Sequence, residues 1–196
     1  MMLMLSRRAI VLLSCVVMGC AAEGNDTRQR DAQARANPDA LVLQDFKERI
    51  DQYLKVHNKA KREVPALKET KDPAKIQATR EGLAEKIRAA RTDAKAGDIF
   101  TPDVRQAFRK LMYPELKGRE GAETKASLKE DAPKGVLLKV NAKYPEAAPL
   151  PTMPPNLLAA LPKLPEPLEY RIIGRDLILL DVDADLIVDY FPAAIR

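Results

Sequence analysis

The sequence predicts an α+β fold: a small helical bundle or hairpin, then a proline-rich strap, then a C-terminal three-stranded antiparallel meander. Three patterns support this prediction: proline-marked starts of amphipathic stripes before residue 116, eight prolines between residues 144 and 167, and short β-rich runs after residue 167. The chain has 196 residues, which is enough for one domain or two small ones. With no Trp and 5% aromatic residues, we expect modest cores rather than one deep core.

The helical module is predicted over residues 40–116. Asn37-Pro38-Asp39, Asp72-Pro73 and Thr101-Pro102-Asp103 each combine a capping side chain with proline, which suits the first helical position. Apolar residues then recur at helical spacing in each segment. The first stripe is formed by Val42, Phe46, Ile50, Tyr53 and His57, the second by Ile76, Leu83, Ile87, Ala90 and Ala94, and the third by Val104, Phe108, Leu111 and Met112.

Residues 117–167 are predicted to form a charged connector and a proline-rich strap. The connector, residues 117–135, has Leu128 as its only large apolar side chain, so we expect it to be mobile, and Val136–Val140 is a strand candidate. In the strap, prolines favour extended backbone, broken by a short turn at 156–161. The strap is interpreted as lying across a neighbouring surface, or else as a linker; its apolar residues are Leu150, Met153, Leu157, Leu158, Leu161 and Leu164.

The meander is predicted over residues 168–196. Residues 168–173, 176–180 and 186–190 are β-rich, and Gly174-Arg175 between the first two runs suits a type II′ hairpin turn. The segment DVDAD, residues 181–185, then forms the second turn. Alternation along 186–190 predicts that one face is the more buried.

The first nineteen residues have the parts of an export signal. Arg7 and Arg8 precede the apolar run of residues 9–18, which is too short for a membrane helix of about 20 residues. The following segment, Val17-Met18-Gly19-Cys20, resembles the lipobox of bacterial lipoproteins. The resemblance implies that residues 1–19 are removed and that Cys20 is acylated and becomes the first residue. A plain secretory signal with an incidental cysteine is the alternative reading.

The resemblance to lipoproteins also implies a location. Ala21 stands where a retention aspartate would sit in the sorting rule of Gram-negative lipoproteins, which implies an outer-membrane anchor facing the periplasm. Residues 20–39 are polar and without apolar period, so we predict a flexible tether between lipid and fold. Both cysteines, Cys15 and Cys20, lie in the first twenty residues, which leaves the mature chain without an intramolecular disulfide.

Charge excludes one partner class and suggests another. Removal of Arg7 and Arg8 reduces the formal charge from +5 to +3, which is too mild to indicate nucleic acid binding. Residues 55–91 nevertheless hold eleven Lys or Arg against five acids, whereas residues 176–189 hold five Asp and no base. The basic stretch is interpreted as a solvated helix face, with a surface for anionic lipid or polymer as the alternative.

No catalytic constellation is found. His57 is the only histidine, which excludes a His-based triad or a multi-His metal site. Because it lies in an apolar stripe, we interpret it as a packed or edge residue rather than a functional one. Ser127 is the only serine after residue 20 and has no Gly-x-Ser-x-Gly context. We therefore predict that the protein is not an enzyme and needs no cofactor; a carboxylate-dependent hydrolase remains an alternative.

The acidic tail raises a second hypothesis. Asp181, Asp183, Asp185 and Asp189 fit four places of a calcium loop, but Leu186 and Pro192 stand where Gly and Glu are needed, which favours a polar turn over a cation site. Residues 168–181 with Ile187-Val188-Asp189 resemble the C-terminal β unit of RcnB-like periplasmic proteins. That resemblance implies a β meander, and also keeps metal homeostasis as an alternative function.

Taken together, these features predict a non-catalytic, lipid-anchored protein of the cell envelope that acts as an interaction, assembly or structural factor. Its expected partners are the membrane, through the lipid on Cys20, and an envelope protein or anionic polymer.

Overall fold

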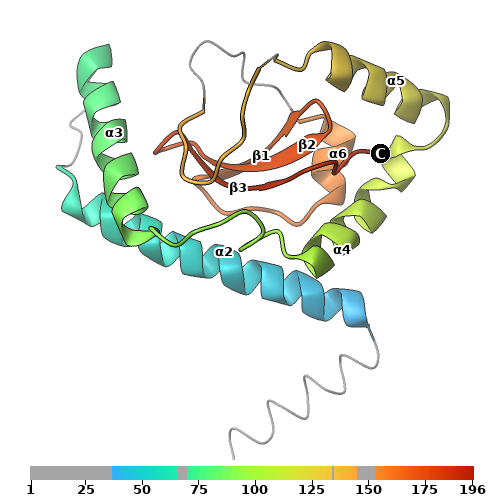
Figure 1. Ribbon diagram of the computed structural model, residues 1–196, viewed down its shortest axis with the longest axis horizontal. Helices are drawn as coiled ribbons and strands as arrows, with labels where there is room; N and C mark the ends of the chain where they lie inside the picture. The colour runs from blue at the N-terminus through green and yellow to red at the C-terminus, as the bar shows by residue number, and fades with distance from the viewer. Residues whose placement is uncertain (1–36, 66–69, 134, 145–152) are drawn as a thin grey trace, which may run out of the picture. The chain divides into compact units, whose positions relative to one another are not determined.

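The computed structural model describes residues 37–65, 70–133, 135–144 and 153–196. The predicted signal peptide, Cys20 and residues 20–36 of the predicted tether lie outside the described residues, as do strap residues 145–152 with Leu150. The fold class is α+β, as predicted: helices come first and a three-stranded antiparallel sheet ends the chain (Figure 1). Among the described residues, the structure contains no helix with the length and apolar character needed to cross a membrane.

The three predicted helices form at the predicted starts. They are α2 (Pro38–Glu63), α3 (Pro73–Ala90) and α4 (Pro102–Met112). Capping fixes two of these starts: the Asp72 carboxylate accepts from the backbone N–H of Ala74, and the Thr101 hydroxyl accepts from that of Val104. The second predicted stripe extends past its helix, because α3 ends at Ala90 and Ala94 lies beyond it in the turns that follow.

The C-terminal meander is confirmed. Strands β1 (Leu168–Ile173), β2 (Asp176–Asp181) and β3 (Leu186–Phe191) pair in the order β1-β2-β3, each antiparallel to the next. Gly174 has φ +60° in the first turn, as the leading position of a type II′ turn requires. The second turn is DVDAD without its first residue, since Asp181 is the last residue of β2.

Residues on both faces of the sheet are buried, so the alternation along 186–190 does not separate a more buried face from a less buried one as predicted. The pairing of β2 with β3 skips Val188, because Leu179 faces Asp189 whereas Leu180 faces Ile187. This bulge shifts the alternation of β3, so that Asp189 falls on the same face as Leu179. Simple period-two reasoning could not anticipate that shift.

Helices and strands share one large core, so the prediction of modest cores rather than one deep core was wrong. Buried side chains of α2, α3 and α4 join those on one face of the sheet in a single cluster, which includes Phe46, Ile87, Phe108, Leu179 and Phe191. Figure 1 shows α2 running along the sheet. A smaller cluster on the opposite face joins Ile178 and Leu180 to Tyr144 of the preceding loop.

The mobile connector predicted at 117–135 is instead largely a helix, α5 (Gly118–Glu130), which follows the 3₁₀ turn η1 (Pro114–Leu116). Leu128 anchors α5 in the core, and Gly121 is buried where α5 meets Leu116. The strand candidate 136–140 was also wrong: this segment is a loop, and Val136 and Leu138 pack against the sheet.

The described part of the strap packs as predicted. It contains α6 (Pro155–Ala160), close to the turn expected at 156–161. Met153, Leu157 and Leu161 are buried in the main core, while Leu158 is 48% exposed. The strap therefore contributes three apolar side chains to the fold rather than serving as a free linker.

Candidate functional site

The four aspartates of the tail do not converge on one point. Asp181 and Asp189 are buried and bind different segments, whereas Asp183 and Asp185 lie in the β2–β3 turn at intermediate exposure. Asp185 has φ +51°, a left-handed backbone conformation that Asp tolerates better than most residues. Within the described ranges, no three acidic, histidine or cysteine residues are grouped so that they could hold a metal ion. The geometry gives the cation hypothesis no support.

Asp181 is the centre of a buried polar cluster that reaches from β2 to α2. Its Oδ2 accepts from the Tyr53 hydroxyl at 2.6 Å and lies 2.6 Å from His57 Nδ1. Its Oδ1 accepts from the backbone N–H groups of Asp183 and Ala184, each at 3.0 Å. Because an ionised carboxylate only accepts, His57 carries its proton on Nδ1 and donates it.

The buried cluster continues outward to the surface. His57 Nε2 lies 3.7 Å from Asp183 Oδ2, and Lys61 Nζ donates to the same oxygen at 2.6 Å. His57 and Lys61 are four residues apart on α2, so both lie on the helix face toward the turn. The acids of DVDAD thus attract basic groups, and those groups belong to the same chain.

Electrostatics inside this cluster follow from burial and from the Asp181 charge. Burial raises the pKa of Tyr53 well above its ordinary value, and the adjacent carboxylate raises it further. Burial also opposes ionisation of Asp181, but hydrogen bonds from His57 and Tyr53 outweigh it and lower the pKa of Asp181. The carboxylate is therefore charged in the folded protein at neutral pH.

Asp189 is the second buried anchor. Its carboxylate accepts from the backbone N–H groups of Gly97, Ile99 and Phe100 at 2.8 to 2.9 Å, and it is fully buried. These N–H groups belong to the loop that joins α3 to α4. The sheet thus holds α2 through Asp181 and the α3–α4 loop through Asp189.

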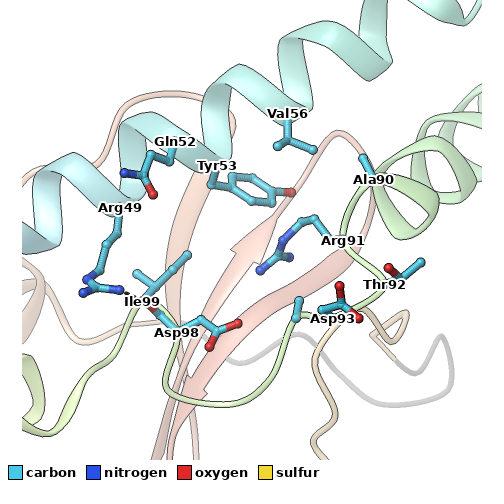
Figure 2. A pocket seen from close by; sticks show the side chains of 11 residues that line it. Arg49, Gln52, Tyr53, Val56, Ala90, Arg91, Thr92, Asp93, Asp98 and Ile99 are labelled. Carbon is cyan, nitrogen blue, oxygen red and sulfur yellow. Dashed lines mark hydrogen bonds between the residues drawn. The ribbon is translucent and has the colours of Figure 1, made fainter.

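An open polar pocket of about 420 Å³ lies between the middle of α2 and the α3–α4 loop. Figure 2 shows the Arg91 guanidinium pointing into it beneath the Tyr53 ring, and the Asp98 carboxylate pointing inward from the loop. The Arg91 guanidinium carbon lies 4.9 Å from the centre of that ring. On the α2 side, Arg49 donates to the Asp45 carboxylate and to the Asp98 carbonyl oxygen.

The prediction for His57 is confirmed, because the ring is 1% exposed within the shared core. Its partner Asp181 was singled out for a different role, and the pairing joins residues 124 positions apart. The pocket was not predicted, although Tyr53, Ala90 and Ala94 of its lining belong to the predicted apolar stripes. Arg91 was counted only as one charge of the basic stretch, and no local pattern marks a side chain that becomes important through tertiary packing.

Comparison with known proteins finds no matching family model, no similar curated protein and no similar solved structure. The β meander implied by the resemblance to RcnB-like proteins is present. Membership of that family and of the lipoproteins remains a prediction from the sequence.

Proposed function

We propose that this protein is a lipid-anchored component of the cell envelope that acts by interaction or assembly and not by catalysis. The N-terminal segment supplies the anchor in this proposal: residues 1–19 direct export, and Cys20 receives the lipid. The folded part then stands in the periplasm, attached to the outer membrane through its N-terminus.

One observation favours a non-catalytic role above the others. His57 and Asp181 have the pairing of a general-base dyad, with 2.6 Å between Nδ1 and Oδ2, yet they are 1% and 0% exposed. The second imidazole nitrogen faces Asp183, not a hydroxyl or thiol. A catalytic dyad of this kind activates a nucleophile or water through the second imidazole nitrogen, whereas here that nitrogen faces a carboxylate and the pair joins α2 to the sheet.

Membrane fractionation of a cysteine variant tests the anchor. We expect Cys20→Ala to move the protein from the membrane pellet to the soluble fraction after washing at high salt, because the acyl chains are lost. Cys15→Ala is the matched control, since it removes the other cysteine and leaves the proposed lipidation residue in place.

Equal membrane association of Cys20→Ala and the parent protein would remove the anchor from the proposal. Equal loss in both cysteine variants would indicate a general failure of export instead.

A further inference from the structure

The polar pocket between α2 and the α3–α4 loop is lined by both cationic and anionic side chains. Arg49 lies on α2, Arg91 directly follows α3, and Asp93 and Asp98 lie in the loop between α3 and α4. The pocket volume of about 420 Å³ falls within the range of about 300–1,000 Å³ that small-molecule sites occupy. Every lining residue lies in the part of the chain that the structure describes.

Arg91 is a partly buried cation whose hydrogen bonds go to neutral groups. One guanidinium nitrogen donates to the side-chain oxygen of Asn141 at 2.8 Å, and the other terminal nitrogen donates to the carbonyl oxygen of Val188 at 3.1 Å. Within the described ranges, Arg91 has no carboxylate at ion-pair distance, and burial lowers its pKa. Asp98, Asp181 and Asp189 stabilise this charge only through space, so a carboxylate entering the pocket would supply the direct counterion that no described residue provides.

The acids of the pocket set a second requirement. No described residue hydrogen-bonds to the Asp93 side chain, and Asp98 uses one carboxylate oxygen to accept from the Lys95 backbone N–H. Two carboxylates beside the arginines repel a simple anion, just as the arginines repel a simple cation. A molecule that carries a positive and a negative charge close together can pair with both the arginines and the aspartates.

We propose that this pocket binds a zwitterion of the amino-acid type, with its carboxylate toward Arg91 and its ammonium group toward Asp93 and Asp98. The Tyr53 ring and Ile99 provide apolar surface beside the charged groups, against which a ligand side chain packs. The proposal does not depend on the lipid anchor, because the pocket belongs entirely to the folded part.

The first experiment screens the standard amino acids against the full chain purified in detergent, by thermal unfolding at about 10 mM ligand. At least one amino acid should raise the melting temperature, because a ligand that binds only the folded state stabilises it. Calorimetry then compares that amino acid with the amine that lacks its carboxylate and the acid that lacks its amino group. Each fragment should bind about tenfold more weakly or worse, since each loses one set of charge-assisted hydrogen bonds.

Two variants locate the binding. Asp93→Asn should weaken binding about tenfold without lowering the melting temperature of the free protein, because Asp93 is exposed. Asp51→Asn, an exposed acid of α2 outside the pocket, is the matched control and should bind as the parent does. Arg91→Gln removes the cation itself and should abolish binding. Its circular dichroism spectrum reports whether this variant remains folded.

Three results would overturn the proposal. They are no stabilisation by any amino acid, binding of the carboxylic-acid fragment as tight as that of the amino acid, and an Asp93→Asn variant that binds like Asp51→Asn.

Discussion

Replacing Asp181 by Asn should destabilise the protein far more than the same change two residues later. In Asp181→Asn, the amide keeps the shape of the carboxylate but loses the charge to which Tyr53 and His57 donate at 2.6 Å. Hydrogen bonds to a charged group contribute about 1.5–3 kcal/mol each, and breaking a buried pair costs about 3–5 kcal/mol. We therefore expect a loss of about 3–5 kcal/mol, a large part of the roughly 5–15 kcal/mol that stabilises a typical domain.

Asp183→Asn is the matched control for this prediction. The Asp183 side chain is 37% exposed and pairs with Lys61, which is 60% exposed. Solvent screens such a pair, so its removal should cost no more than about 1 kcal/mol. Urea unfolding followed by circular dichroism measures both variants against the parent protein.

A double-mutant cycle with Tyr53→Phe tests the cause. The cost of removing the Tyr53 hydroxyl should fall by at least about 1 kcal/mol when Asp181 is already Asn, because the two groups interact directly. Equal free energies of unfolding for Asp181→Asn and Asp183→Asn would refute the reasoning, and so would additive effects in the cycle.

Two further predictions concern acid stability and α5. Because the folded protein lowers the pKa of Asp181, its stabilising contribution is present above the unfolded value of about 3.9 and is lost as pH falls through the folded pKa. The gap in urea midpoint between the parent and Asp181→Asn should thus narrow from pH 6 to pH 3; a constant gap would contradict this. Gly121→Ala should cost about 1–3 kcal/mol in urea unfolding, because the new Cβ would overlap the Leu116 backbone. Gly118→Ala is the control without a steric clash: a Cβ there meets no neighbour within 4 Å, so any loss of stability comes only from the φ of +66°.

Local chemistry made the helix starts and the meander predictable. Proline with a capping Asp or Thr marks a helix start within a few residues, and a glycine-led two-residue turn fixes the register of the first hairpin. The packing of the strap was also predictable, because its many leucines gain free energy by burial against the fold, which a solvated linker would not allow.

The predictions that failed concern features that depend on tertiary contacts. Helix α5 has a polar sequence and is held by few residues, with Leu128 anchored in the core and Gly121 against η1. The bulge at Val188 reverses the face of Asp189, and no nearby residue type announces it. The sequence also could not show that two of the four aspartates considered together as a possible cation site bind separate segments about ninety or more residues away.

Intact mass spectrometry of the purified mature protein tests the central functional claim most directly. We predict that the wild-type chain begins at Cys20 and carries the added mass of acyl groups, and that Cys20→Ala carries no such added mass. A mature chain without added lipid, or one that retains residues 1–19, would contradict it.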